Sequence, residues 1–201
     1  MGELILIRHG ETEWSRARRH TGRTDIPLTQ AGVDAARALS PVLDRRGLVA
    51  AFASPLSRAW RTAELAGLSG VQPDPDLVEW DYGGYEGLTR SAIQQSRPGW
   101  SLWRDGVIPG DAEHPGEELT EVGARTDAVL ERVRPLLQDG DVALVGHAHL
   151  LRVLTARWLG QDPQAGRLFR LDTGTLSVLG TEHGEPVITA WNTPPGAADL
   201  L

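Results

Sequence analysis

Two histidines in this sequence stand where they could carry phosphoryl-transfer chemistry. His9 lies in the motif Arg8-His9-Gly10-Glu11-Thr12, and His147 follows Val145-Gly146. A neutral imidazole is a good nucleophile near pH 7, because its ordinary pKa is about 6.5. Arg8 offers a planar fork of N–H donors that fits a phosphate group. We also expect Gly10 to let the backbone come close to an anion.

Both histidines follow short apolar runs that are typical of buried parallel strands, at residues 4–7 and 142–145. In an open α/β sheet, ligands bind beyond the carboxyl ends of the strands. The sequence therefore predicts that His9 and His147 share one face of the protein, although they are far apart along the chain.

The other elements predict an α/β fold. Thr29 is a candidate N-cap for a helix to about Leu39, which Pro41 should kink or end. The remaining expected strands are residues 49–53, 176–179 and 187–190, and the remaining helices run from Pro55 to 66, 119–137 and 150–159. Strands that alternate with helices predict a three-layer sandwich with a mostly parallel central sheet and helices on both faces.

The length suits a single domain over residues 1–201. Residues 72–118 are less regular, rich in glycine and proline, and contain three of the seven tryptophans. We read this segment as a small insertion of short helices and loops.

Composition excludes several classes of function. The formal net charge of −7 argues against nucleic acid or an acidic membrane as partner. The chain has no cysteine, which excludes disulfides, zinc–thiolate sites and cysteine nucleophiles. The first apolar run is too short for a signal peptide or a membrane span, so we expect a cytoplasmic protein. All 20 Lys/Arg residues are arginine, so only position can mark an arginine as part of a site.

Motifs in several blocks resemble the histidine phosphatase superfamily, in the branch with the cofactor-dependent phosphoglycerate mutases. The blocks are residues 8–12 with 22–29, residues 54–59, residues 79–87 and residues 145–147. They occur in the family order and span nearly the whole chain.

The resemblance implies a catalytic set of His9, Glu79 and His147. His9 would accept the phosphoryl group, while Arg8, Arg58 and His147 would bind its oxygens. Glu79 would protonate the leaving oxygen and then activate water against the phosphohistidine.

Two neighbouring carboxylates, Asp81 and Glu86, are alternatives for the acid. Family chemistry uses no metal and no cofactor, since arginines supply the positive charge.

Further candidates follow from the resemblance. Arg23 and Thr24 stand where the family contacts substrate or phosphate, and Ser15 stands where many members have asparagine. Segments 79–83, 103–106, 147–152 and 171–174 resemble the sugar-phosphatase subgroup that includes sedoheptulose bisphosphatase.

In that subgroup, Arg104 and Arg152 are candidates for a second anionic group or for sugar hydroxyls, with a scaffold role as the alternative. His149 would line the pocket or lie behind it. Arg16, Arg18 and Arg19 are read as a solvated face.

The expected function is a phosphomonoester hydrolase that acts on small sugar phosphates through a phosphohistidine on His9. A phosphoglycerate mutase and a non-catalytic phosphate-binding module are the alternatives, with a phosphohistidine protein phosphatase as a variant. The expected partner is a small phosphorylated metabolite, and a homodimer is left open.

Overall fold

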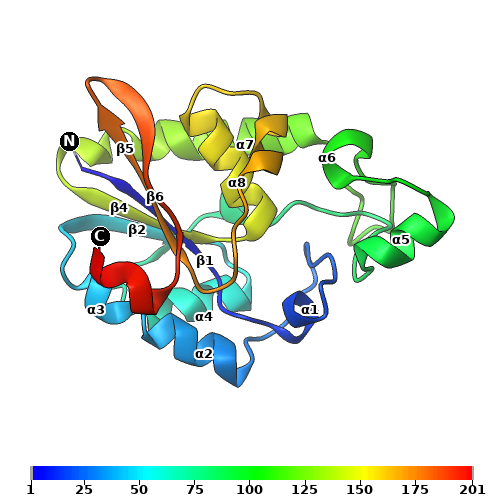
Figure 1. Ribbon diagram of the computed structural model, residues 1–201, viewed down its shortest axis with the longest axis horizontal. Helices are drawn as coiled ribbons and strands as arrows, with labels where there is room; N and C mark the ends of the chain where they lie inside the picture. Colours follow the sequence, from blue (N-terminus) through cyan, green and yellow to red (C-terminus); the bar gives the residue numbers. More distant parts are fainter. Residues whose placement is uncertain (1, 201) are drawn as a thin grey trace.

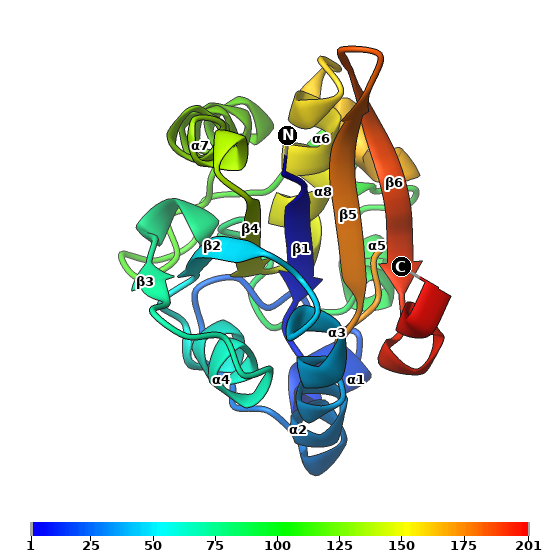
Figure 2. The same ribbon diagram turned by 90° about the vertical axis from the view of Figure 1, so that its left-hand side faces the viewer.

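The computed structural model describes residues 2–200, which form a six-stranded sheet in the order β3-β2-β4-β1-β5-β6 (Figures 1 and 2). The four parallel strands are β1 (Leu4–Arg8), β2 (Leu48–Ala53), β3 (Gln72–Pro73) and β4 (Asp141–Gly146). Strands β5 (Leu176–Glu182) and β6 (Glu185–Thr193) form a hairpin, and β5 pairs antiparallel with β1. The predicted fold class, an α/β sandwich with a mostly parallel sheet, is confirmed.

Helices cover both faces of the sheet (Figure 2). Helices α2 (Gln30–Arg37), α3 (Ser40–Leu43) and α4 (Ser57–Leu65) lie on one face. Helices α7 (Leu119–Val133) and α8 (Ala148–Trp158) lie on the other. The short 3₁₀ helices are η1 (Pro75–Leu77), η2 (Leu136–Gln138), η3 (Pro163–Leu168) and η4 (Pro195–Leu200).

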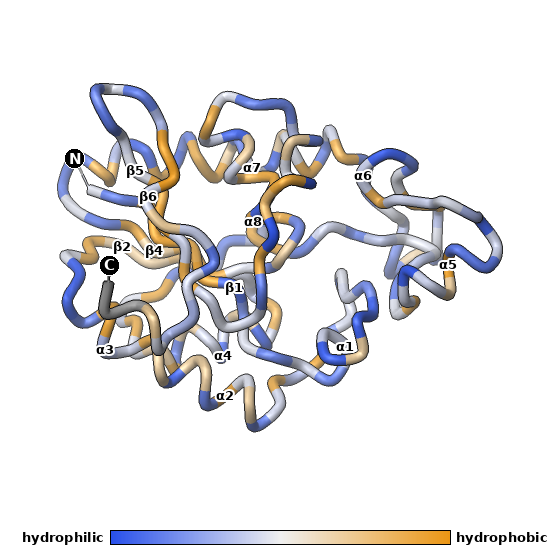
Figure 3. Tube along the Cα trace, viewed as in Figure 1, coloured by the Kyte–Doolittle hydropathy of each residue, from blue (hydrophilic) through white to orange (hydrophobic). Residues whose placement is uncertain are grey.

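Strand β1 shows how the sequence builds the two cores. Successive side chains of a strand point to opposite faces. Leu4 and Leu6 accordingly enter the larger core under α7 and α8, while Ile5 and Ile7 enter the smaller core over α2–α4. The hydrophobic colouring of Figure 3 follows these central strands. A strand that is buried on both faces therefore reads as one continuous apolar run.

The chain leaves the sheet between β3 and α7, and this excursion carries α5 (Arg90–Ser96) and α6 (Leu102–Asp105) (Figure 1). Gln72 and Pro73, the first residues of the expected insertion, pair with β2 as a sheet edge, so the departure begins after them. The excursion adds Tyr82, Tyr85 and Trp100 to the larger core. We infer a single domain, because the excursion and the sheet share one core.

Three local details differ from the sequence reading. The helix capped by Thr29 ends at Arg37, and Pro41 lies in the first turn of a new helix, α3, where a missing N–H costs nothing. Helix α8 begins at Ala148, directly after His147. A short helix that we did not expect, α1 (Glu13–Arg16), follows the Arg-His-Gly motif.

Helix α1 is held by Thr12 at its N-cap. The Thr12 side chain accepts a hydrogen bond from the Ser15 N–H, and the Ser15 hydroxyl lies 2.9 Å from the Thr12 N–H, which completes a capping box.

None of the helices in residues 2–200 combines the length and the hydropathy that crossing a membrane requires.

Candidate active site

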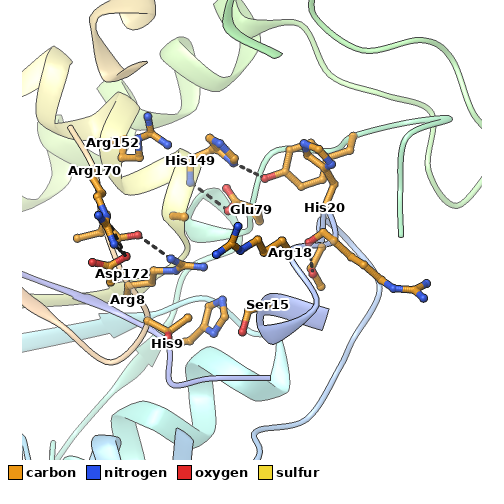
Figure 4. Close-up of a pocket in the computed structure, with 16 residues that line it drawn as sticks. Arg8, His9, Ser15, Arg18, His20, Glu79, His149, Arg152, Arg170 and Asp172 are labelled. Atoms are coloured by element: carbon orange, nitrogen blue, oxygen red, sulfur yellow. Dashed lines mark hydrogen bonds and ion pairs between the residues drawn. The ribbon is translucent and has the colours of Figure 1, made fainter. Parts of the chain in front are cut away.

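A cavity of about 600 Å³ opens beyond the carboxyl ends of β1 and β4 (Figure 4). The pairing of Arg8 with Gly146 places His9 and His147 side by side at this edge of the sheet. Their ring centroids lie 5.1 Å apart. The cavity is lined by Arg8, His9, Ser15, Arg18, Arg19, His20, Thr21, Glu79, Tyr82, Ala148, His149, Arg152, Arg170, Leu171, Asp172 and Thr173.

His9 is held in the form that a nucleophile needs. Its Nδ1 lies 2.7 Å from the Gly10 carbonyl, which can only accept, so Nδ1 carries the proton and the Nε2 lone pair is free. Burial lowers the pKa of His9 well below 6.5, and the charges of Arg58 and Arg8 lower it further. The ring is therefore neutral at physiological pH.

Gly10 has a different role from the one that we expected. Its N–H donates to the Thr62 hydroxyl over 3.0 Å, so this donor is not free for an anion. A Cβ at Gly10 would lie only 2.4 Å from the Gly32 carbonyl oxygen. Gly10 is needed because α2 packs directly against the turn that carries His9.

Arg8 holds a free donor beside His9. Its Nη1 donates to the Leu171 carbonyl at 2.6 Å, which anchors the guanidinium. Its Nε–H is buried and has no hydrogen-bond partner. No other buried side-chain nitrogen or oxygen in the described part of the chain lacks a partner in this way. Leaving a buried donor unpaired is costly, so an orphaned N–H in a cavity wall indicates a ligand position.

Arg58 lies behind the cavity and is fully buried. Its guanidinium donates to the carbonyls of Thr21, Gly22 and Thr24, and its Nε donates to His147 Nδ1 at 3.2 Å. Four of its five donors are thus used within the protein. Arg58 ties the segment 21–24 to α4 and also adds positive charge beneath the site.

His147 is also fully buried and does not line the cavity. Because its Nδ1 accepts from Arg58, its Nε2 carries the proton and donates to the Ser54 hydroxyl at 2.8 Å. Burial and the charge of Arg58 lower the pKa of His147 well below 6.5. Both histidines are therefore neutral, and arginines alone supply the positive charge of the site.

Glu79 lines the cavity, with its carboxylate held by the N-terminus of α8. Its Oε1 accepts from the backbone N–H groups of Trp80 and Leu150, and its Oε2 accepts from that of His149. The side chain is nearly buried, and three donors fix its orientation toward the cavity.

The two alternative acids do not line the cavity. Asp81 accepts from the Gly83 N–H, and Glu86 accepts from the N–H groups of Gly22 and Thr24. Burial raises the pKa of Glu86, but its oxygens are used to hold this loop.

Three residues proposed from the sequence lie away from the cavity. Arg23 is exposed, with its Nε 3.9 Å from an Asp81 oxygen. Thr24 bonds His114 through its hydroxyl and Arg58 through its carbonyl. Arg104 is 65% exposed and pairs with Asp105 at 2.8 Å.

Three other proposed residues do line the cavity, namely Ser15, His149 and Arg152. The His149 Nδ1 lies 2.6 Å from the Tyr82 hydroxyl. Arg152 is anchored by two backbone carbonyls and lies over the Trp103 ring, 4.7 Å from its centroid. Burial lowers the pKa of His149 well below 6.5, and Arg152 lowers it further.

Sequence reasoning missed part of the cavity wall. Arg18 and Arg19, read as a solvated face, line the cavity because the chain turns inward directly after α1. Tyr82, Arg170 and Asp172 also line it, and all three lie in or beside segments that carried the family resemblance. The signal that the sequence offered for Arg18 was its place between two blocks that carry the family resemblance, residues 8–12 and 22–29.

Comparison with known proteins gives a consistent result. The model of the histidine phosphatase superfamily (branch 1) matches residues 4–194. An acid phosphatase of Mycobacterium tuberculosis is 36% identical over 183 residues, which cover 90% of this chain and 87% of that protein. Sedoheptulose 1,7-bisphosphatase of Saccharomyces cerevisiae is 33% identical, over 80% of this chain and 68% of that protein.

Mutase-named relatives and a solved structure complete the comparison. A Serratia proteamaculans protein named probable phosphoglycerate mutase GpmB is 32% identical, over 95% of this chain and 90% of that protein. The solved structure of an open reading frame from Mycobacterium tuberculosis superposes with a TM-score of 0.89 at 33% identity. It covers 96% of this chain and 98% of that one.

Proposed function

Because the chain belongs to the histidine phosphatase superfamily, branch 1, we propose that it hydrolyses phosphomonoesters with His9 as the nucleophile. The observation that carries this proposal is the neutral His9, whose proton is on Nδ1 and whose Nε2 lone pair is free at the cavity. No group of three or more His, Cys, Asp or Glu side chains that could hold a metal ion occurs within residues 2–200.

The first step transfers the phosphoryl group to His9. Nε2 attacks phosphorus in line with the ester oxygen, the P–O bond breaks, and the leaving alcohol takes a proton from the Glu79 carboxyl. In the second step, water gives a proton to the Glu79 carboxylate and attacks the phosphohistidine. Inorganic phosphate leaves, and both residues return to their starting forms.

Charge on the phosphoryl oxygens is stabilised by arginine and by hydrogen-bond donors. The unpaired Arg8 Nε–H points to a position for one oxygen, and Arg58 supplies a second positive charge. The His147 Nε2–H donates to Ser54 in the free protein. We propose that a phosphoryl oxygen replaces Ser54 as its acceptor once the substrate is bound.

The proposed substrates are small sugar phosphates. A cavity of about 600 Å³ is in the range that holds a small metabolite. Relatives include an acid phosphatase and a sedoheptulose bisphosphatase, which supports a phosphorylated sugar as the substrate class.

The test is phosphate release from sugar phosphates, phosphoglycerates and an aryl phosphate, in EDTA, with His9→Ala as the control. We expect release that survives EDTA and is lost in the variant, and rapid quenching should trap label from a phosphorylated substrate on His9. Label at another residue, or an undiminished His9→Ala variant, would overturn the assignment.

A second candidate is a phosphoglycerate mutase, which the relative named GpmB favours. With a bisphosphoglycerate primer, a mutase isomerises phosphoglycerate without releasing phosphate. A phosphate-binding module without activity would bind phosphate and turn over no ester. A cytoplasmic location and a homodimer stay predictions, which cell fractionation and light scattering can test.

A further inference from the structure

Arg18 is the cavity arginine whose guanidinium has no protein partner within the described residues. Arg8 is anchored by Leu171, Arg152 by two backbone carbonyls, and Arg170 by Asp172. Arg19 reaches the Gly87 carbonyl at 3.4 Å and lies over Trp14. An arginine that lines a cavity and makes no hydrogen bond to the protein has all five N–H donors available for a ligand.

The backbone places this arginine by an uncommon conformation. Arg18 has φ of 56°, in the left-handed region that residues other than glycine seldom adopt. The turn is held on both sides. Before it, the Arg18 N–H donates to the Ser15 carbonyl. After it, the His20 N–H donates to the Leu88 carbonyl, and the His20 carbonyl accepts from the Gly87 N–H. Strained residues of this kind concentrate at functional sites.

The side chain points toward the leaving-group side of the cavity. Figure 4 shows Arg18 extending from the turn after α1 into the cavity, toward Arg8 and Glu79. In an in-line displacement, the leaving oxygen lies on the far side of phosphorus from His9. Glu79 marks that side, because it protonates the leaving oxygen in the proposed mechanism. A group near Glu79 that faces the cavity mouth therefore meets the alcohol portion of the ester.

The charges of the cavity exceed what one phosphate needs. Five guanidinium groups line it against two acidic side chains, Glu79 and Asp172, of which Glu79 is protonated in the proposed substrate complex, and the histidines with lowered pKa values add no charge. A bound phosphate ester brings about two negative charges at pH 7. A surplus of positive charge therefore remains on the cavity walls. Among the arginines that carry it, Arg18 is the one whose guanidinium has no protein partner within the described residues.

We propose that Arg18 determines specificity by binding a second anionic group, a phosphate or a carboxylate, on the alcohol portion of the substrate. The inference rests on the proposed function and adds to it the substrate class: phosphate esters whose leaving alcohol is itself anionic. Arg152, on the first turns of α8, lines the same cavity and can share this group.

The test compares matched substrates in an Arg18→Asn variant. Asparagine tolerates the left-handed conformation, so the turn is kept while the cation is removed. The pairs are fructose 6-phosphate with fructose 1,6-bisphosphate, and glycerol 3-phosphate with 3-phosphoglycerate; an aryl phosphate reports the chemistry alone. The control is Arg16→Asn, two residues earlier at the end of α1, since Arg16 pairs with Glu13 and does not line the cavity.

In at least one pair, we expect Arg18→Asn to lower kcat/KM for the substrate with a second anionic group tenfold or more relative to the substrate without it. The loss should come mainly through KM. The pair affected tells a phosphate from a carboxylate. Arg18→Lys should recover part of the preference, and Arg16→Asn should match the wild type. Equal losses on all substrates, or no loss, would overturn the proposal.

Failure of the proposed function gives a different result. A wild-type protein that releases no phosphate even from the aryl ester refutes the hydrolase. Calorimetry can then measure the affinity of the wild type and of Arg18→Asn for both substrates of each pair. These affinities still decide whether Arg18 binds a second anion. A preference for the doubly anionic member that Arg18→Asn abolishes would support that role, and equal affinities would overturn it.

Discussion

Replacing Arg58 by methionine should unfold the site as well as inactivate it. The guanidinium is fully buried and donates to the carbonyls of Thr21, Gly22 and Thr24 and to His147 Nδ1. Methionine fills similar space but supplies no donor. Four acceptors therefore lose their partner at once.

The expected cost follows from these contacts. Each buried acceptor that loses its donor costs about 1–3 kcal/mol, so four such losses, partly offset because a desolvated charge is also removed, should destabilise the protein by about 3–5 kcal/mol. For a chain of this size, each kcal/mol lowers Tm by roughly 2–4 °C, so the melting temperature should fall by about 6–20 °C. The segment 21–24 should also loosen against α4, where the hydrogen bonds from Ser57 to Asp25 would be left as the remaining tie.

Urea unfolding followed by tryptophan fluorescence measures this loss directly. The matched control is Arg61→Met on the same helix, whose side chain is 57% exposed and pairs with Glu64. An exposed pair of this kind contributes little, so the control should stay within about 0.5 kcal/mol of the wild type. If Arg58→Met lost activity but stayed within about 1 kcal/mol of the wild type, the structural role derived for Arg58 would be wrong.

Three further outcomes are expected. Glu79→Gln should slow turnover by about 10²–10⁴-fold for poor leaving groups and much less for an aryl phosphate; equal losses would argue against an acid role. His9, His147 and His149 have pKa values well below 6.5 through burial. Below pH 6.5 these histidines bind protons in the unfolded chain but stay neutral in the folded protein. Urea-measured stability should therefore be full above pH 6.5 and fall by up to about 1.4 kcal/mol per pH unit for each histidine as pH drops; a flat profile would refute this. Since His9 is already neutral, kcat/KM per folded molecule should follow only the titration of the substrate phosphate, whose second pKa is about 6. After correction for that titration, a remaining step near pH 6.5 would contradict the lowered pKa of His9.

The parts of the fold that the sequence predicted are those with a strong local signal. Residues 4–7 and 142–145 are apolar on both faces, which is typical of a strand covered on both sides. From there, the rule that ligands bind at the carboxyl ends of strands was enough to pair His9 with His147. Arg8 and Glu79 reached the cavity because they lie in the motifs that end and follow those elements.

The parts that sequence reasoning misplaced depend on side-chain direction in irregular backbone. Arg104 lies on the four-residue helix α6, and no periodicity in so short an element indicates which way a side chain points. Arg18 was assigned to solvent, because nothing in its residue type reveals a left-handed turn. The role of Gly10 depended on contact with Gly32, in a helix that only the folded structure brings against it.

The cavity is built from two sources, and this division has a consequence for engineering. His9, the proposed nucleophile, stands at the end of a rigid, doubly covered strand, whereas much of the wall comes from the turn after α1 and from the segment 170–173. Randomising residues 18–21 would therefore change which alcohol is accepted while the strand ends that carry His9 and His147 stay intact. A library confined to that turn could explore new substrates on unaltered chemistry.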